Sequence, residues 1–383
     1  MNKTVLHWSY RDYDHVPLDL LYYDEDLEEL YLKENFIRTI PLWMFHLSHL
    51  KFIHLSGNLI EYIPDGIHGL KFLEFLDLSG NQISNCPSSL GGLSHLQSLN
   101  LSGNRIEIVP KSLCSLKKLE FLDLSDNLIT KLPIELCECT RLSNLALNDN
   151  PHLLHVPERI INMSSLQSFS ANRCGLLYLP AIANKFINNV QMFHNTTVRH
   201  VPMVFEKFFS SYFFDGAQSA TTYYNNGQQD KDKDTESVEY ENNPHYFTVR
   251  EKETGIILLL PFGTRHVFSL DGPDNQVTLY DDCLHVINYI NLYLNFYKYP
   301  PFLDSLPSKA MGDHITNGPI ARCTNKNCLV VLYTSYYLAV CRKTLSSCKM
   351  LFSCFFCSKF CGFAWLSANK GKYINIPWEI CDN

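Results

Sequence analysis

The chain has 383 residues, enough for one long or two modest domains, and a formal net charge of -7 at pH 7. A mildly acidic chain argues against general nucleic-acid binding. The opening residues, Met1 to Tyr10, lack the long apolar stretch of a signal peptide. We therefore expect a cytoplasmic or nuclear protein whose fourteen cysteines are reduced.

Residues 1–26 are predicted to form a short capping coil. Leu6, Trp8 and Pro17 keep part of a pattern that becomes regular further along the chain, and Arg11 stands where the regular pattern has asparagine. A partial repeat at one end is typical of the cap that closes a solenoid.

A ladder of asparagines follows, with one asparagine every 23 residues: Asn35, Asn58, Asn81, Asn104, Asn127 and Asn150. A fixed period of this length is typical of a solenoid. In the clearest unit, Leu122 and Leu124 share one face of a short strand and point into the core. The side chain of Asn127 can both donate to and accept from the turn that follows, and Pro133 fixes φ where the return path begins.

These positions identify the unit as a leucine-rich repeat. Prolines count the coils independently, at Pro17, Pro41, Pro64, Pro87, Pro110, Pro133, Pro157, Pro180 and Pro202. Cys174 takes the asparagine position in the seventh unit, and Asn195 restores it in the eighth. We predict an α/β solenoid, a horseshoe of eight repeats over residues 27–210, followed by a small α+β cysteine-rich domain.

Side chains that point away from the core should align in columns on the concave sheet. The first column is Tyr31, His54, Asp77, Asn100, Asp123, Ala146, Ser170 and Gln191. The second is Glu29, Phe52, Phe75, Ser98, Phe121, Asn144 and Ser168. Three phenylalanines beside two aspartates favour a client-binding surface, since aromatic anchors dominate protein interfaces. The alternative is that these rings only cover their neighbours on the sheet.

The composition changes after the repeats. Residues 211–245 are polar and poor in aliphatic side chains, which predicts a disordered linker or long loop. Two β-prone runs from Tyr246 to Pro261, separated by a polar turn at Glu251 to Gly255, then predict a hairpin within a segment at residues 246–300.

Residues 276–297 are predicted to form an amphipathic helix. Thr278, Leu279, Cys283 and Ile287 resemble the BC box of elongin-binding ubiquitin-ligase receptors, and Tyr299 to Leu303 is similar to the proline-centred cullin box that follows it. The resemblance implies binding of elongin B and C and a cullin. The alternative is a core helix with a buried cysteine.

Residues 301–383 form the block richest in cysteine. Cys323 and Cys328, with Cys357 and Cys361, make two knuckle-like pairs suited to one tetrahedral four-thiolate zinc site. Cys354 is the rival ligand, because it forms a Cys-x-x-Cys pair with Cys357. Cys341 and Cys348 are predicted to be packing residues, and a set of free buried thiols is the alternative to zinc.

No Gly-rich phosphate loop, nucleophile elbow or His-Glu-x-x-His pattern is present in the sequence, so we expect no enzyme activity. A redox role for Cys354 and Cys357 is disfavoured because aromatic rather than cationic residues flank them. A membrane anchor at Met350 to Leu366 is disfavoured because Lys359 and two serines interrupt the apolar run.

The repeats that end in Asn195-Thr-Thr-Val-Arg-His-Val-Pro202, the helix at Thr278 and the cysteine knuckles at Cys323 and Cys357 together resemble the intracellular leucine-rich repeat-containing proteins 28 and 58. The resemblance covers most of the chain. It implies a non-enzymatic, monomeric adaptor that binds a protein client and serves as substrate receptor of an elongin–cullin ubiquitin ligase. A signalling scaffold without ubiquitin chemistry is the alternative.

Overall fold

The computed structural model describes residues 4–381 except for 24–25, 162, 181–186, 193–194, 196–197, 199–200, 203–246, 254, 256, 262–263, 273–319, 329 and 346–347. The chain divides into two compact units. Unit 1 comprises Met1–Val156, Asn162–Gly175 and Asn184–Asn195, and unit 2 comprises Pro157–Ile161, Leu176–Ala183 and Thr196–Asn383. The two are described separately below.

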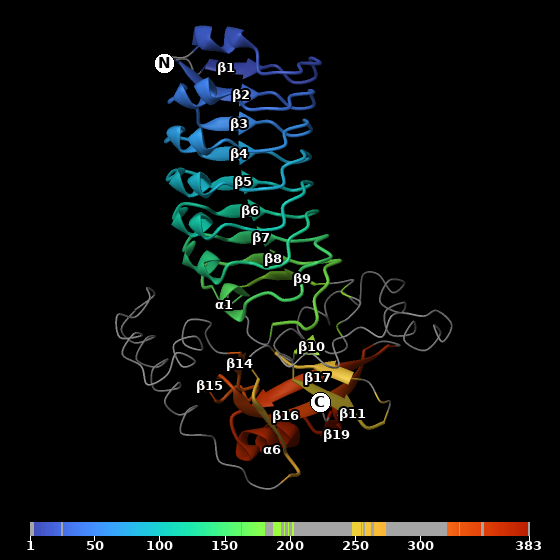
Figure 1. The fold of residues 1–383 in the computed structure, drawn as a ribbon. Coiled ribbons are helices and arrows are strands. Elements are labelled where there is room, and N and C mark those ends of the chain that lie inside the picture. Colours follow the sequence, from blue (N-terminus) through green and yellow to red (C-terminus); the bar gives the residue numbers. More distant parts are fainter. Residues whose placement is uncertain are drawn as a thin grey trace, which may run out of the picture. The chain divides into compact units, whose positions relative to one another are not determined.

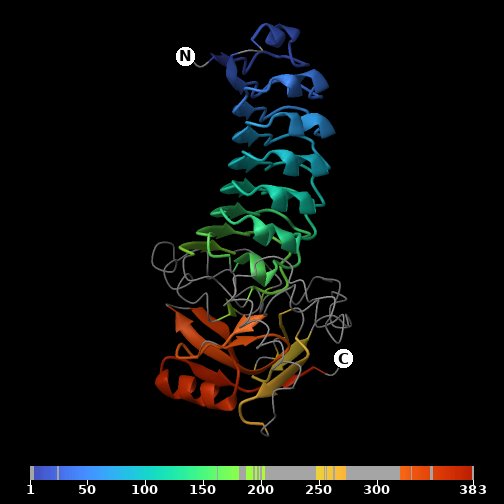
Figure 2. The same ribbon diagram turned by 90° about the vertical axis from the view of Figure 1, so that its left-hand side faces the viewer.

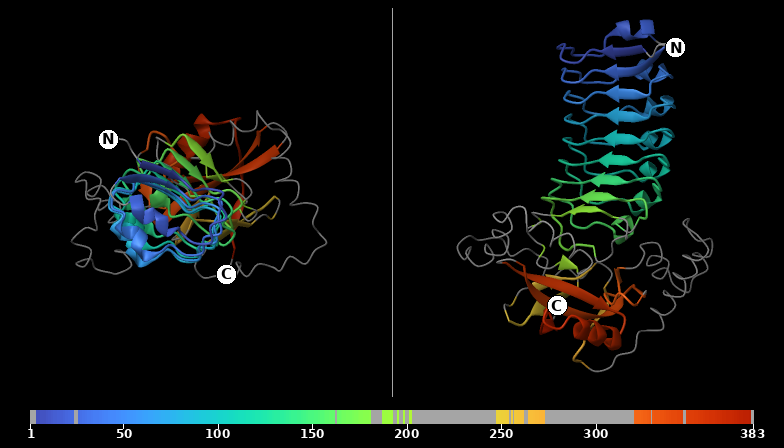
Figure 3. Two further views of the ribbon diagram at one scale, coloured as in Figure 1. Left: turned by 90° about the horizontal axis from the view of Figure 1, so that it is seen from above. Right: turned by 180° about the vertical axis from the view of Figure 1, so that it is seen from behind.

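Unit 1 is a stack of coils that each contribute one strand to a nine-stranded parallel sheet (Figure 1). The strands lie in chain order, as the right panel of Figure 3 shows. They are β1 (Thr4–His7), β2 (Leu27–Tyr31), β3 (Phe52–His54), β4 (Phe75–Asp77), β5 (Ser98–Asn100), β6 (Phe121–Asp123), β7 (Asn144–Ala146), β8 (Ser168–Ser170) and β9 (Asn189–Gln191). This arrangement confirms the predicted solenoid.

The coil around β6 shows how the repeat sequence makes the fold. Leu122 and Leu124 are fully buried, whereas Phe121 and Asp123 point outward, as the alternation of side chains along a strand requires. Two residues after Leu124, Asp126 adopts a φ of 54°, which turns the chain away from the sheet. The matching residue in the second to fourth repeats is Gly57, Gly80 or Gly103, because glycine adopts this left-handed region without steric cost.

In six coils of unit 1 the return side is a short 3₁₀ helix that begins just after a proline. Pro133, with φ of -67°, precedes η6, and the same arrangement recurs at Pro41, Pro64, Pro87 and Pro110. Proline supplies the required φ and lacks an N–H that would be left without a partner at a helix start. The 3₁₀ helices are η1 (Leu18–Tyr23), η2 (Leu42–His46), η3 (Asp65–Gly69), η4 (Ser88–Gly92), η5 (Lys111–Ser115) and η6 (Ile134–Glu138).

The ladder asparagines are buried and join each coil to the one before it. In Asn104, Nδ2 donates to the carbonyl oxygens of Leu101 in its own coil and Leu78 in the preceding coil, both at 3.0 Å. Its Oδ1 accepts from the backbone N–H of Ile83 at 3.0 Å. The same pattern holds at the other members of the ladder, at Asn58, Asn81 and Asn127 for example. The side chain therefore satisfies buried backbone groups in two coils at once.

The two irregular positions of the ladder are accommodated within the same scheme. Cys174 replaces asparagine in the seventh unit, and its Sγ donates to the carbonyl oxygen of Leu147 at 3.2 Å. In the capping coil, the backbone N–H of Arg11 donates to Oδ1 of Asn35 at 3.0 Å. β1 pairs in parallel with β2, so the cap extends the sheet.

Unit 2 contains a five-stranded mixed sheet, a three-stranded sheet and a two-stranded sheet. The five-stranded sheet has a long antiparallel hairpin at its centre, β16 (Ser335–Leu345) and β17 (Cys348–Phe356). Around it lie β10 (Val201–Pro202) parallel to β17, β13 (His266–Ser269) parallel to β16, and β18 (Ile374–Ile376) antiparallel to β16. In the described part of unit 2 the helices are α1 (Glu158–Ile161) and α6 (Lys359–Ala368), and α6 contacts β16 and β17 (Figure 2).

The smaller sheets of unit 2 use short strands. β11 (Thr248–Glu251) lies between β12 (Ile257–Leu259) and β19 (Trp378–Ile380), and both pairings are antiparallel. The predicted hairpin segment thus contains β11 and β12. β14 (Ala321–Arg322) pairs antiparallel with β15 (Val331–Leu332).

Two other sequence predictions can be placed. Residues 211–245 and the predicted helix at 276–297 lie outside the described residues. The run from Met350 to Leu366 is divided between β17 and the ten-residue helix α6. Within the described part of the chain, no helix has the length and apolar character needed to span a membrane.

Candidate functional site

The outward side chains of the unit 1 sheet lie in the two columns that the repeat period predicts. Strand pairing places Phe52 opposite Phe75, Phe75 opposite Ser98, and Ser98 opposite Phe121. In the other column it places Tyr31 opposite His54 and His54 opposite Asp77. The remaining members pair in the same registers, namely Glu29, Asn100, Asp123, Asn144, Ala146, Ser168, Ser170 and Gln191. We call this surface the outer strand face.

Aromatic and imidazole rings stack across the first four strands of the outer strand face. His7 and Tyr31 have ring centroids 4.5 Å apart, and Tyr31 and His54 lie 4.4 Å apart at an interplanar angle of 8°. Phe75 continues the row at 4.6 Å from His54. The sequence-based columns did not include His7, because it belongs to the capping coil, where the repeat pattern is only partial.

Asp77 is the most buried acidic group on this face, with 8% of its surface exposed. Its Oδ1 accepts from the backbone N–H of Ser79 at 3.1 Å and from the Ser79 hydroxyl at 2.7 Å, and its Oδ2 lies 3.8 Å from Nδ1 of His54. Burial alone would raise the pKa of Asp77, but His54 and Ser79 outweigh it and lower the pKa to about 2. The carboxyl group is therefore ionised at neutral pH.

The last three strands carry a different surface, made of neutral amides and hydroxyls. Nδ2 of Asn148 donates to Oγ of Ser170 at 3.0 Å, and Nδ2 of Asn189 donates to Oγ of Ser168 at 3.1 Å. The side chain of Gln191 in turn donates to Oδ1 of Asn189 at 3.4 Å. These groups satisfy one another, so this part of the face has fewer polar atoms to offer to a partner.

A second candidate site lies in unit 2, where Cys323, Cys328, Cys357 and Cys361 come together. Their four Sγ atoms all lie within 4.8 Å of one another. Sγ of Cys357 is 3.6 Å from Sγ of Cys328 and 3.6 Å from Sγ of Cys361. Four sulfurs bound at the usual zinc–sulfur distance in a tetrahedron would be separated by about 3.8 Å. The cluster is thus compatible with zinc in both donor type and spacing.

Four elements of unit 2 position these cysteines. Cys323 and Cys328 lie in the loop between β14 and β15, Cys357 follows the end of β17, and Cys361 is in the first turn of α6. Ser358 caps α6, with its hydroxyl accepting from the backbone N–H of Cys361 at 3.3 Å. A helix N-terminus favours a thiolate at this position.

Thr324 fixes the first cysteine pair to the strand that leads to the second. Its backbone N–H donates to the carbonyl oxygen of Phe355 at 2.7 Å, and its Oγ1 accepts from the backbone N–H of Phe355 at 2.9 Å. Sequence reasoning missed this residue, because its importance depends on the strand it contacts 31 positions away.

Hydrogen bonds within the cluster shift the pKa values of its cysteines in opposite directions. A hydrogen bond from Cys357 lowers the pKa of Cys323 to about 5, and the same interaction raises the pKa of Cys357. The backbone N–H of Asn325 also favours the Cys323 thiolate. One thiolate is accommodated without a metal, whereas four would require a bound cation.

Two other cysteines of this block are not members of the cluster. Cys354 and Cys341 are fully buried and pack in a core that includes Tyr337, Phe356 and Trp365. Neither belongs to the set of four mutually close sulfurs. The side chain of Cys348 and the elongin-binding candidates Thr278, Leu279, Cys283 and Ile287 lie outside the described residues.

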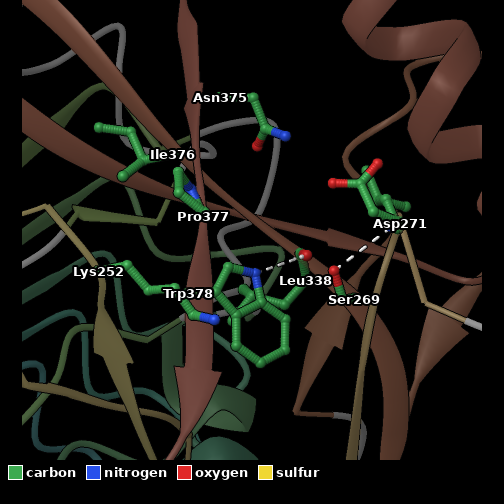
Figure 4. Close-up of a pocket in the computed structure, with 9 residues that line it drawn as sticks. Lys252, Ser269, Asp271, Leu338, Asn375, Ile376, Pro377 and Trp378 are labelled. Carbon is green, nitrogen blue, oxygen red and sulfur yellow. Dashed lines mark hydrogen bonds between the residues drawn. The ribbon is translucent and has the colours of Figure 1, made fainter.

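A cavity of about 210 Å³ also opens in unit 2 (Figure 4). Trp378 lies across it and donates from Nε1 to the carbonyl oxygen of Leu338 at 3.3 Å, while Lys252, Ser269 and Asp271 contribute polar groups to the lining. The volume is below the range of roughly 300–1,000 Å³ that is usual for ligand pockets, so we assign it no ligand.

A family model for leucine-rich repeats matches residues 25–83 and 85–129. Unit 1 is therefore a leucine-rich repeat solenoid. The match coincides with coils of unit 1. No curated protein sequence matches the chain.

Solved structures of leucine-rich repeat proteins are similar over about half of this chain. A protein from Leptospira interrogans is 26% identical, with a TM-score of 0.47, over 51% of this chain and 53% of its own. The ectodomain of the receptor kinase GASSHO1/SCHENGEN3 from Arabidopsis thaliana, in complex with CASPARIAN STRIP INTEGRITY FACTOR 2, is 28% identical over 46% of this chain and 22% of its own, with a TM-score of 0.43. The plant peptide hormone receptor RGFR1 in complex with RGF2 is 26% identical over 49% and 31%, with a TM-score of 0.45.

Proposed function

We propose that this leucine-rich repeat protein is a non-enzymatic adaptor that holds a protein client on its outer strand face. The observation that carries the proposal is the row of rings and acids on β2 to β6, which includes Phe75, Asp77, Phe121 and Asp123. Phe121 is 37% exposed although it is a large apolar side chain. Stacked repeats commonly use such an extended face for binding, and aromatic side chains supply most of the energy in protein interfaces.

The sharper form of the proposal is that the client is presented to an elongin–cullin ubiquitin ligase, as the resemblance to the intracellular leucine-rich repeat-containing proteins 28 and 58 implies. The motivating residues are Thr278, Leu279, Cys283 and Ile287 in the predicted helix. In this role the chain recruits elongin B and C and a cullin, and it transfers nothing itself. A signalling scaffold without ubiquitin chemistry is the alternative.

The test is a pulldown of purified elongin B and C with the full chain. Wild type is compared with Leu279→Ala/Cys283→Ala and with Asp281→Ala, which lies off the predicted apolar stripe. We expect the double variant to lose binding and Asp281→Ala to keep it, with circular dichroism showing that all three remain folded. Absence of binding by folded wild type would reject the ligase role and leave the scaffold alternative.

We further propose that the four-cysteine cluster holds a structural zinc ion. The supporting observations are the four sulfurs within 4.8 Å of one another and their origin in two knuckles and a helix N-terminus. With all four positions filled by protein, such a zinc has no open coordination site for catalysis. Its effect would be to cross-link the β14–β15 loop, the end of β17 and α6.

We also propose that the protein lies in the cytoplasm or nucleus, because a thiolate zinc site requires reduced cysteines. We propose in addition that it is a monomer. Fractionation of cells expressing the chain checks the compartment, and recovery in a secreted or membrane fraction would contradict it.

A further inference from the structure

We propose that the client segment bound by the outer strand face is basic. In this arrangement a Lys or Arg of the client reaches the carboxylates of Asp77 and Asp123, and an adjacent apolar part of the client packs against Phe75 and Phe121. The inference rests on the proposed client-binding function and names the chemistry of the client.

The register of β4, β5 and β6 creates the recognition geometry. β4 presents Phe75 and Asp77, and β6 presents Phe121 and Asp123 at the equivalent positions. Between them, β5 presents the small Ser98 in the phenylalanine column. Neighbouring strands are separated by about 4.8 Å, so β4 and β6 are about 10 Å apart at the backbone. One cationic group placed above β5 can therefore approach carboxylates from both sides.

The acidic side chains on and beside β4 and β6 include Glu74 and Glu120, which directly precede these strands, as well as Asp77 and Asp123. Among the described residues, no Lys or Arg lies within ion-pair distance of Glu74, Asp77, Glu120 or Asp123. Lys51, which directly precedes β3, is paired with Glu28 at 3.0 Å. A basic partner complements this surface, whereas an acidic peptide or a nucleic acid would be repelled.

The aromatic rings beside these acids also favour a basic client. Phe52 and Phe75 have centroids 6.3 Å apart, and Phe121 is exposed one strand beyond Ser98. A guanidinium or ammonium group over an aromatic face is attracted by the ring quadrupole, and its aliphatic stem packs on the same surface. Acids and rings at alternating positions of one strand therefore favour Arg and Lys over other side chains.

Asp77 keeps its charge although it is largely buried, because the Ser79 hydrogen bonds and His54 lower its pKa to about 2. Asn100 makes the equivalent pair of hydrogen bonds with Ser102, at 3.0 and 2.8 Å. An aspartate is thus not needed for the turn, since asparagine serves equally well one coil later. The turn therefore does not require the negative charge of Asp77, which remains on the outer strand face.

The experiment selects random dodecapeptides displayed on phage against the immobilised full chain. Selections on wild type run beside Asp77→Asn/Asp123→Asn, Phe75→Ala/Phe121→Ala and a control, Asn144→Ala/Ser168→Ala, in the same column on β7 and β8. The Asp→Asn changes keep the hydrogen-bonding pattern that Asn100 shows is compatible with the fold. Synthetic peptides from the enriched clones are then titrated by fluorescence anisotropy.

We expect clones enriched in Lys and Arg that bind the aspartate variant at least about tenfold more weakly than wild type, bind the control unchanged, and weaken as salt is raised. Clones without basic enrichment that lose binding only to the phenylalanine variant would overturn the basic client and retain the client face. Clones that bind all four proteins equally would overturn both. Failure to select any binder on wild type would also overturn the inference.

Discussion

The two units of this protein achieve their structure in different ways. In unit 1 the same contacts recur in every coil, and each ladder asparagine satisfies backbone groups of its own coil and its neighbour. In unit 2 the β14–β15 loop, β17 and α6 meet at one cluster of four cysteines. Stability is therefore distributed along unit 1 and concentrated in unit 2, and substitutions should have graded effects in the first and large effects in the second.

The distribution of contacts in unit 1 also separates folding from recognition. The buried column of Leu76, Leu99 and Leu122 is nearly uniform, whereas the outward residues on the same strands differ from coil to coil. The core requires a repeated apolar side chain, but the outer strand face does not. Client anchors can therefore be concentrated on β2 to β6 without interrupting the solenoid.

The largest predicted effect is that of removing the proposed zinc from unit 2. Structural zinc contributes on the order of 10 kcal/mol to the folding of a small domain, comparable to the whole stability of most domains. Zinc removal by a chelator, or Cys361→Ser, should therefore abolish amide protection in β16, β17 and α6 and leave that of β3 to β7 unchanged. Hydrogen exchange with mass spectrometry measures both units in one sample, and elemental analysis measures the zinc.

Cys341→Ala is the matched control, since Cys341 is fully buried in unit 2 but lies outside the cluster. It should retain one zinc per chain and most amide protection. Purified wild type without zinc, but with the same protection in unit 2, would show that the thiols need no metal and would remove the contrast between the units.

Asn104→Ala tests whether each ladder asparagine contributes to the stability of unit 1. The substitution leaves the carbonyl oxygens of Leu78 and Leu101 and the N–H of Ile83 without their buried partner. Each such group costs about 1–3 kcal/mol, so the three together predict a loss of about 3–9 kcal/mol, less than the loss of zinc. Urea denaturation followed by circular dichroism measures the change.

Asn104→Cys sharpens the same test, because Cys174 occupies the ladder naturally and donates to Leu147. It should cost about half as much as alanine. Asn85→Ala, at an exposed asparagine outside the ladder, should change stability by less than about 0.5 kcal/mol. Equal losses at Asn104 and Asn85 would mean that the ladder contributes nothing specific.

The sequence predicted unit 1 closely because its period also determines its register. Once Asn81 and Asn104 are aligned, Phe75 must pair with Ser98 and Asp77 with Asn100, and they do. The four-cysteine cluster was also predictable from the sequence. Two closely spaced pairs of reduced cysteines suggest a single metal site.

The remainder of unit 2 could not be predicted in this way. β10 pairs with β17 and β13 pairs with β16, across separations that no periodic pattern encodes. The two hydrogen bonds between Thr324 and Phe355 likewise join segments that are far apart in the sequence. Such long-range pairings are decided by packing between distant segments, so they appear only in the folded structure.

The smallest effect expected comes from one carboxyl group of unit 1. The pKa of Asp77 is lowered to about 2 in the folded chain, against about 3.9 when unfolded. A lowered folded-state pKa gives stability that is fully present above the unfolded value and is lost as the pH falls through the folded value. Asp77 should therefore contribute about 2 kcal/mol at neutral pH, lost between about pH 4 and pH 2.

Other carboxyl groups titrate in the same range, so the measurement is the difference between wild type and Asp77→Asn in urea denaturation at each pH. The difference should be about 2 kcal/mol at pH 6 and should shrink as the pH approaches 2. A difference that stays constant with pH would show that the carboxyl group is not stabilised by its charge. Because asparagine keeps the turn, as Asn100 does with Ser102, the comparison isolates the charge of one side chain among many equivalent coils.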